Sequence, residues 1–329
     1  MAKVKYISVE AAAQKWRISE RSARNYCAQG RVEGSLLEGK TWKIPSTAQK
    51  PERKPRHSST AETLLAFLKR EKDAGLKGGI YHKIQIDLTY NSNHIEGSKL
   101  THDQTRYIFE TKTIGVTDKA VKVDDIVETV NHFRCIDLII QGANAKLTES
   151  LIKQLHFILK SGTTDSQKSW FKVGDYKMLQ NVVSDGEAGK TVQWTVLSES
   201  PSSCAAKASV GGSETTKPAE VAGAIKALLQ EYNSKSKITF DDILDFHVRF
   251  EAIHPFQDGN GRVGRLIMFK ECLRHNIVPF IITEKLKMFY YRGIDNWKRE
   301  SGFLRDTCLT AQDAMKATLD YFGIKYEDD

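Results

Sequence analysis

The sequence lacks any apolar run approaching the roughly 20 residues that a membrane-spanning helix needs. Residues 1–5 also lack the apolar core of a secretory signal peptide. The five cysteines are odd in number and widely spaced, and no two of them form a C-x-x-C pair. This pattern excludes a zinc framework and argues against disulfides. We therefore expect a cytoplasmic protein with reduced thiols and no membrane segment.

The excess positive charge is confined to one end of the chain. Residues 1–60 contain 13 Lys and Arg against 5 Asp and Glu, whereas the remaining residues contain 36 of each sign. The whole net charge of +8 therefore lies in the first sixth of a 329-residue chain. A basic segment of this kind favours an acidic partner such as nucleic acid. The length and the hydrophobic fraction of 40% suit two domains, and no internal repeat is present.

Residues 1–46 are predicted to form a small unit of two helices and a hairpin. Ser8 and Ser19 can each cap a helix, and Gly30 can end the second one. The short connection between the two helices gives a helix-turn-helix spacing. Alternating residues at 41–45 then predict the second strand of a hairpin, in the place of a wing.

Three polar residues share one face of the second expected helix. Arg21, Arg24 and Asn25 are spaced at i, i+3 and i+4, which suits contacts with phosphates and base edges. The unit resembles the winged helix-turn-helix of the excisionase/MerR type, whose wing ends in Trp-Lys-Ile-Pro as residues 42–45 do here. The resemblance implies that these three residues bind DNA. A basic subdomain that binds protein, or has no partner, is the alternative.

The rest of the chain is expected to be mainly helical. Residues 47–60 hold two prolines and a basic run without hydrophobic periodicity, which predicts an exposed linker before a second domain at 61–329. A strand-like segment at 171–183 precedes a loop at 184–216 that is expected to be irregular. Helices are expected at about 64–75, 80–95, 123–141, 149–161, 218–232, 284–298 and 310–323. Two more are expected to open at Thr101 and at Thr239, and another to run from the glycine-bracketed turn to about residue 275.

The stretch from His254 to Arg265 combines a base, a carboxylate, a glycine-bracketed turn and two arginines. His254 titrates near neutral pH and can take a proton from a hydroxyl. Asp258 can hold Mg²⁺ that shares phosphate oxygens. Gly259 and Gly261 allow close approach of the backbone to a ligand, and a helix opening there would bind an anion at its N-terminus.

Each of these features has an ordinary structural explanation on its own, but together they resemble the signature of the Fic (filamentation induced by cAMP) family, H-x-F-x-D/E-G-N-G-R-x-x-R. In this resemblance Phe256 anchors the loop in the core, Arg262 binds the β-phosphate of a nucleotide and Arg265 binds its γ-phosphate. The two arginines are three residues apart and share a helix face. The specified positions are His254, Phe256, Asp258, Gly259, Asn260, Gly261, Arg262 and Arg265.

A second motif, Ser92-x-x-x-Glu96-Gly97, closes the helix expected at about 80–97. By itself it indicates an exposed last turn capped by Gly97. Beside the Fic signature it resembles the family's inhibitory element S/T-x-x-x-E-G/N, in the N-terminal arrangement called class II. Ser92 and Glu96 share a face, and the resemblance implies that Glu96 pairs with Arg265 in place of the γ-phosphate.

The resemblance implies a mainly α fold, with an all-helical core and a short β-hairpin flap, and transfer of AMP from ATP to a protein Ser, Thr or Tyr hydroxyl. It makes His254 the base that deprotonates the hydroxyl and Asp258 the ligand of Mg²⁺. It assigns the α-phosphate to Asn260 and to the amides around Gly259 and Gly261. The sequence therefore predicts an autoinhibited protein adenylyltransferase.

Partners and alternatives follow from the same resemblance. The segment 171–183 takes the position of the flap that pairs with a protein target, although Lys177 stands where arginine is common. The target can be the protein itself, and both a monomer and a homodimer stay open. Two other functions stay open as well: a DNA-binding transcriptional regulator that uses the Fic fold as a nucleotide sensor, and an enzyme that removes AMP from a modified protein.

Overall fold

The structure, a computed structural model, describes residues 5–39, 41–51, 62–115, 120–184, 191–194 and 212–327. Most of the expected linker therefore lies outside the described residues. Where the chain is described, it is mainly helical, with two small three-stranded sheets. This confirms the predicted fold class.

The N-terminal unit contains the expected helices and hairpin. Ser8 caps α1 (Val9–Trp16) and Ser19 caps α2 (Glu20–Ala28), each through its side-chain oxygen. Strand β3 (Thr41–Pro45) pairs antiparallel with β1 (Tyr6–Ile7) on one side and with β2 (Leu36–Glu38) on the other. The unit has an apolar core of its own, made by Ala12, Ala13, Trp16, Ala23, Cys27, Val32 and Ile44.

Within the described residues, the larger part of the chain begins with five helices, three of which start at a residue that caps them with its side chain. Thr63 caps α3, Thr101 and Gln104 form a reciprocal capping box on α5, and Thr148 caps α7. These caps satisfy backbone N–H groups that have no partner inside the helix. The helices are α3 (Leu64–Asp73), α4 (Ile80–Ile95), α5 (His102–Thr111), α6 (Val123–Gln141) and α7 (Glu149–Lys160).

A second sheet follows α7. Strand β4 (Asn181–Ser184) pairs antiparallel with both β5 (Thr191–Trp194) and β6 (Gly212–Glu214), with Val183 opposite Val192 on one side. The strand expected over 171–183 forms only from Asn181 onward, and residues 171–180 are turns and irregular backbone, so this expectation is wrong for most of its length. The expectation of an irregular loop over 184–216 is wrong for β5 and β6, because their pairing partner is β4 and such pairing has little signature in a Gly/Ser-rich segment.

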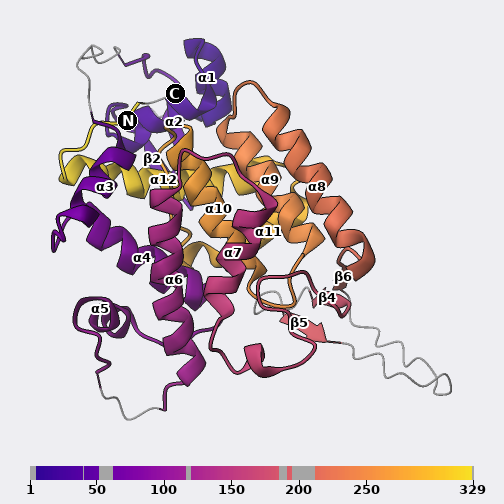
Figure 1. The fold of residues 1–329 in the computed structure, drawn as a ribbon. Coiled ribbons are helices and arrows are strands. Elements are labelled where there is room, and N and C mark those ends of the chain that lie inside the picture. The colour runs from indigo at the N-terminus through magenta and orange to yellow at the C-terminus, as the bar shows by residue number, and fades with distance from the viewer. Residues whose placement is uncertain are drawn as a thin grey trace.

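One helix, α10 (Asn260–Arg274), lies at the centre of the larger part of the chain (Figure 1). It packs against α9 (Phe240–Ile253), α6, α7 and α4, and nearly every one of its residues is buried. The buried charged residues of α10 therefore need partners inside the protein. The remaining helices are α8 (Pro218–Ser234), α11 (Lys287–Asn296) and α12 (Gly302–Tyr321).

Helix α12 starts well before the expected residue 310. Its N-cap is Ser301, a residue type that often starts a helix, but the Ser301 side chain makes no capping hydrogen bond. The helix instead gains its first turns by packing against α11. Its buried Leu304 lies directly against Gly293 of α11, where a Cβ atom would be 2.6 Å from the Leu304 Cα.

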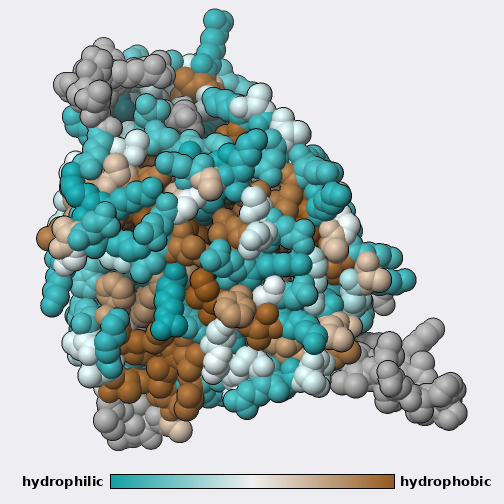
Figure 2. All heavy atoms as spheres, in the orientation of Figure 1, coloured by the Kyte–Doolittle hydropathy of each residue, from teal (hydrophilic) through white to brown (hydrophobic). Residues whose placement is uncertain are grey.

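The visible surface is mostly polar (Figure 2). Apolar side chains gather low on this face, where Figure 1 places α5 and the start of α6. Val123, the first residue of α6, is 72% exposed there. None of the helices in the described part of the chain is long and apolar enough to cross a membrane.

Candidate active site

Helix α9 delivers His254 to the site. Thr239 and Asp242 start the helix with a capping box, and His254 ends it as the C-cap, in the left-handed conformation with φ 51° and ψ 62°. A left-handed backbone costs a non-glycine residue about 1–3 kcal/mol and must be held by its surroundings. The His254 amide donates to the carbonyl of Phe250 at 3.0 Å, and the residue is 7% exposed. The imidazole is thus placed by a strained turn rather than by a flexible side chain.

The loop after His254 is closed by Asn260. Its Oδ1 accepts from the Phe256 amide at 2.8 Å, and its Nδ2 donates to the Phe256 carbonyl at 2.9 Å. The Phe256 ring is fully buried, as expected of an anchor. Because both ends of the Asn260 amide are engaged, its side chain shapes the loop. The α-phosphate contact that the resemblance implied for Asn260 stays a prediction.

The N-terminus of α10 faces the site without a capping side chain. Gly259 holds the turn with φ 83° and, as the N-cap, offers no side chain to the first-turn N–H groups. A helix of 15 residues with such a free N-terminus favours an anion. At Gly261 a Cβ atom would lie 2.3 Å from Oε1 of Glu96. The group that the glycine admits is therefore a carboxylate of the protein itself.

Arg265 is bound by the second motif. Its Nε donates to the Ser92 hydroxyl and its Nη2 to the Ser92 carbonyl, both at 3.0 Å, while Nη2 also donates to Glu96 Oε1 at 2.6 Å. Burial opposes the charge on Arg265, but the attraction of Glu96 outweighs it and raises the arginine pKa. Gly97 follows α4 with φ 101°, the left-handed conformation that ends a helix.

One nitrogen of Arg265 is left over. In the described part of the chain, Nη1 is buried and has no hydrogen-bond partner. It lies 3.0 Å from the position that a Cβ of Gly261 would occupy, which places it at the N-terminus of α10. A buried unpaired donor beside free amides is the arrangement that an anionic ligand would complete.

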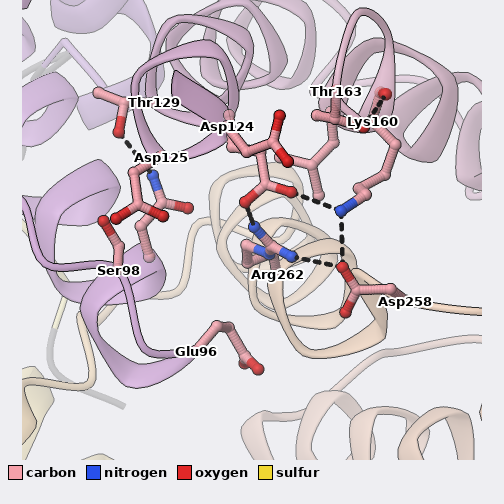
Figure 3. Close-up of polar contacts among 12 residues, drawn as sticks. Glu96, Ser98, Asp124, Asp125, Thr129, Lys160, Thr163, Asp258 and Arg262 are labelled. Atoms are coloured by element: carbon pink, nitrogen blue, oxygen red, sulfur yellow. Dashed lines mark hydrogen bonds and ion pairs between the residues drawn. The ribbon is translucent and has the colours of Figure 1, made fainter. Parts of the chain in front are cut away.

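Arg262 and Asp258 belong to a second ionic cluster, shown in Figure 3. Arg262 donates to Asp258 Oδ2 at 3.1 Å and also to Glu128 on α6. Lys160, the last residue of α7, donates to the same Asp258 oxygen at 2.6 Å and to Glu128 at 2.5 Å. The four side chains form a closed ring of alternating charge, to which Asp165 adds a contact with Lys160 at 3.5 Å.

The charges in this ring are strongly stabilised. Burial disfavours the charge on Asp258, but Lys160 and Arg262 outweigh it and hold the pKa of this carboxyl well below its usual range. Burial likewise opposes the charge on Lys160, yet Asp258 leads the attractions that raise the lysine pKa. Burial opposes the charge on Arg262 too, but the attraction of Glu128 and Asp258 likewise raises its pKa, so Asp258, Lys160 and Arg262 are charged at neutral pH.

The donor set suits a metal carried in by a nucleotide. Asp258 is the carboxylate of the loop, and its side chain is 34% exposed. No group of three His, Cys, Asp or Glu side chains in the described residues could hold a metal on its own. One carboxylate together with phosphate oxygens and water is a usual environment of Mg²⁺. The residues therefore fit Mg²⁺ bound with a phosphate ligand.

The segment expected to form the flap is tied to the same loop. The Leu179 amide donates to Gln257 Oε1 at 3.1 Å, and Gln257 Nε2 donates to Asn181 at 2.8 Å. Lys177 is buried and donates to the hydroxyl of Thr215 at 2.7 Å. Burial lowers the Lys177 pKa to about 8. This lysine is thus a bridge between the two ends of the β4–β6 segment rather than an exposed docking group.

Two buried histidines, which the sequence did not single out, support the site. His156 on α7 stacks on the Phe256 ring with the centroids 3.9 Å apart, and its Nε2 donates to the Asp258 carbonyl at 3.1 Å. Burial lowers its pKa to about 3. Burial, followed by the charges of Arg262 and Arg265, lowers the pKa of His132 to about 3 as well. Both rings are neutral at physiological pH.

Five polar residues of the site were not recognised from the sequence, for one shared reason. They are Glu128, Lys160, His132, His156 and Gln257. Each is a single polar residue inside a helical or loop pattern, and a capping or motif signal marks none of them. Their buried position next to the Fic signature is what identifies them, and burial of this kind is a tertiary property.

The three residues expected to contact DNA lie elsewhere. Arg24 donates to Thr310 at 2.5 Å and pairs with Asp313 at 3.3 Å, both on α12. Arg21 donates to Gln312 on the same helix at 3.3 Å. Arg24 and Asn25 are each 3% exposed. This face of α2 is therefore covered by α12, which corrects the expectation that these residues are open to DNA.

Comparison with protein families identifies the part of the chain that holds the site. Residues 146–272 match the family model described as the Fic/DOC family. This stretch is a Fic/DOC domain. It includes α7 and the whole signature from His254 to Arg265, whereas Ser92 and Glu96 of the second motif lie before it.

The chain is distantly similar to curated proteins named protein adenylyltransferase Fic. The chain is 24% identical over 270 residues to the protein adenylyltransferase Fic of Aedes aegypti, and 25% identical over 260 residues to that of Drosophila grimshawi. The alignments cover 80% and 78% of this chain but 45% of each relative. The chain thus spans less than half the length of these curated relatives.

Solved structures share the fold. A Fic domain containing signaling protein from Bacteroides thetaiotaomicron is 22% identical and aligns with a TM-score of 0.55, covering 92% of this chain and 90% of that one. A Fic family protein from Desulfovibrio desulfuricans is 18% identical, with a TM-score of 0.56 and coverages of 84% and 79%. At these identities the likeness concerns the fold around the Fic/DOC domain.

Proposed function

We propose that the protein is an autoinhibited protein adenylyltransferase, which transfers AMP from ATP to a Ser, Thr or Tyr hydroxyl of a protein. The observation that carries this proposal is the occupied N-terminus of α10. The carboxylate of Glu96 lies against Gly261 and is bonded to Arg265, at the place where the terminal phosphate of a nucleotide would complete the donor set.

The chemistry needs a base, an anion site and a leaving group. His254 would accept the proton of the target hydroxyl while that oxygen attacks the α-phosphorus and pyrophosphate leaves. Free amides of α10 and the two arginines would stabilise the negative charge that develops on the phosphates. Asp258 would hold Mg²⁺, whose charge offsets that of the phosphates. Positioning and electrostatics thus account for the proposed reaction.

The proposed autoinhibition by Glu96 follows from competition between Glu96 and ATP for Arg265. A carboxylate and a phosphate cannot share the same Arg265 donors, and the negative charge of Glu96 would repel a triphosphate at close range. Ser92 strengthens the hold, since its hydroxyl and carbonyl both accept from Arg265. We infer that ATP binds productively only after Glu96 leaves this position.

The target is proposed to be a protein segment that docks on the sheet of β4, β5 and β6 as an added strand. Lys177 supports this sheet through its hydrogen bond to Thr215, which joins the segment before β4 to the segment after β6, and it would not touch the target. The protein itself is the first target to examine, because its own hydroxyl groups are always present at high local concentration.

The test uses ATP labelled at the α-phosphate, with Mg²⁺, and four variants of the full chain. Glu96→Gly is expected to raise self-labelling by at least tenfold, Glu96→Gln to raise it less, and Glu96→Gly with His254→Ala to abolish it. His102→Ala, on the surface of α5, is the control histidine and should leave labelling unchanged. Absence of label in Glu96→Gly would overturn the proposal and favour nucleotide sensing or removal of AMP.

A further inference from the structure

The role of Lys160 is not explained by the Fic signature. It is the last residue of α7, and it is only 2% exposed although it carries a charge. Its ammonium contacts Asp258 at 2.6 Å, Glu128 at 2.5 Å and Asp165 at 3.5 Å. A buried ammonium is costly unless carboxylates surround it. The chain therefore maintains a fixed positive charge directly against the carboxylate that is proposed to hold Mg²⁺.

A purely structural ion pair would not need this position. A clamp between α6 and α7 is complete with Lys160 and Glu128 alone, since they come from those two helices. The shorter route to stability at such a place is a pair of apolar side chains, which often match or exceed a buried ion pair. Here Lys160 also donates to Oδ2 of Asp258, the oxygen that accepts from Arg262 as well. Asp258 directly precedes Gly259, the N-cap of α10.

We propose that Lys160 is a built-in cation of the phosphate site, which supplies part of the positive charge that Mg²⁺ otherwise provides, and that Glu128 offsets this charge. The inference rests on the proposed nucleotide site. Lys160 neutralises Asp258 when no metal is present, so that the carboxylate does not repel the phosphates. When Mg²⁺ arrives, Lys160 and the metal compete for the same carboxylate, which weakens the dependence of ATP binding on the metal.

The two residues therefore have opposite effects on one measurable ratio, the Kd of ATP in EDTA divided by the Kd of ATP with Mg²⁺. Lys160→Met removes a cation, so ATP without metal binds more weakly and the ratio rises by about tenfold, as expected for one charge at close range under partial screening. Glu128→Gln leaves Lys160 less neutralised, so the ratio falls. A general packing defect would move both variants in the same direction.

The experiment measures ATP binding by isothermal titration calorimetry or equilibrium dialysis. The parent protein is the full chain with Glu96→Gly and His254→Ala, which removes both the inhibition by Glu96 and the transfer of AMP. Lys160→Arg should keep the parental ratio, because it keeps the charge. Lys168→Met is the matched control, since Lys168 contacts Asp165 at 2.6 Å without contacting Asp258.

The outcomes separate this inference from the proposed function. A raised ratio in Lys160→Met, a lowered ratio in Glu128→Gln and an unchanged ratio in Lys168→Met would support it. Equal ratios in the parent, Lys160→Met and Glu128→Gln would overturn it and leave Lys160 a structural clamp. A parent that binds no ATP with or without Mg²⁺ would instead overturn the nucleotide site, and with it the proposed function.

Discussion

Gly261 shows how a single residue links the two motifs. A side chain there would meet the carboxylate of Glu96 at 2.3 Å and Nη1 of Arg265 at 3.0 Å. The glycine is required by contact rather than by its backbone, because it lies inside the first turn of α10 and is not among the glycines of positive φ. The closeness of Glu96 to the helix N-terminus therefore depends on the absence of one Cβ atom.

This contact predicts a stability coupling between the two positions. Gly261→Ala alone should lower the free energy of unfolding by about 1–3 kcal/mol, because Glu96 must leave Arg265 to make room. In a Glu96→Ala background the same substitution should cost at least about 0.5 kcal/mol less. Denaturant unfolding of the four proteins of this cycle measures the difference. Simple additivity would mean that Glu96 does not lie against Gly261.

His254 and Asn260 illustrate a division of labour within the signature. His254 is held in a strained left-handed turn, whereas the side-chain amide of Asn260 bonds at both ends to the backbone of Phe256. Strain at one residue is tolerated because bonds at its neighbours over-determine the loop. The signature thus encodes the shape of a loop as much as a set of ligand contacts.

At the scale of elements, the main result is how α2 meets α12. Sequence pattern correctly placed α2 and its basic face, but that face is turned toward the protein. Arg24 bonds to Thr310 and Asp313, and Arg21 lies with its guanidinium carbon 5.4 Å from the ring centre of Phe240. Reading DNA with these residues would require α2 to leave α12.

The docking of α2 gives a prediction about stability. Arg24→Ala leaves the Asp313 carboxylate, itself only 17% exposed, without this partner, and should lower the free energy of unfolding by about 3 kcal/mol. Lys43→Ala, at an exposed position of β3 in the same unit, should change it by less than about 0.5 kcal/mol. Thermal and denaturant melts measure both. Equal stability of Arg24→Ala and wild type would show that α2 does not pack on α12 in solution.

Helix α7 supports both the loop after His254 and the ionic ring around Asp258. It provides His156 beneath the loop and Lys160 beside Asp258, and both project toward α10. Residues four apart share a helix face, so a single orientation of α7 sets both contacts. A shift of this helix would move the loop anchor and the ionic ring together.

At the scale of the whole molecule, the buried histidines make stability depend on pH. His132 and His156 have pKa values of about 3 in the folded protein, against an ordinary 6.5. Below pH 6.5 the unfolded chain takes up two protons that the folded chain does not, so stability falls as the pH decreases toward 3. The pair should cost the folded state about 3 kcal/mol between pH 6.5 and 5.

Substitution of one histidine tests this directly. His132→Asn, which cannot titrate, should lose about half as much histidine-dependent stability over that range as the wild type, even if its stability at pH 7 is lower. The measurement is the free energy of unfolding as a function of pH. An unaltered slope in His132→Asn would contradict the proposed burial.

The sequence by itself determined the local structure and the chemical inventory. Helix starts depend on neighbours within three or four residues, so Ser8, Ser19, Thr101, Thr148 and Thr239 could be recognised as caps. The Fic signature could be read for the same reason, because its twelve residues are consecutive and run from the end of α9 into the first turns of α10.

Only the tertiary structure decided which groups meet. Glu96 reaches Arg265 across 169 positions, Lys160 reaches Asp258 across 98, and Arg24 reaches Thr310 across 286. No local pattern specifies such pairs, because they form only when several helices pack around α10. The same packing determines burial, and burial sets the charge state of His132 and His156 and removes the basic face of α2 from solvent.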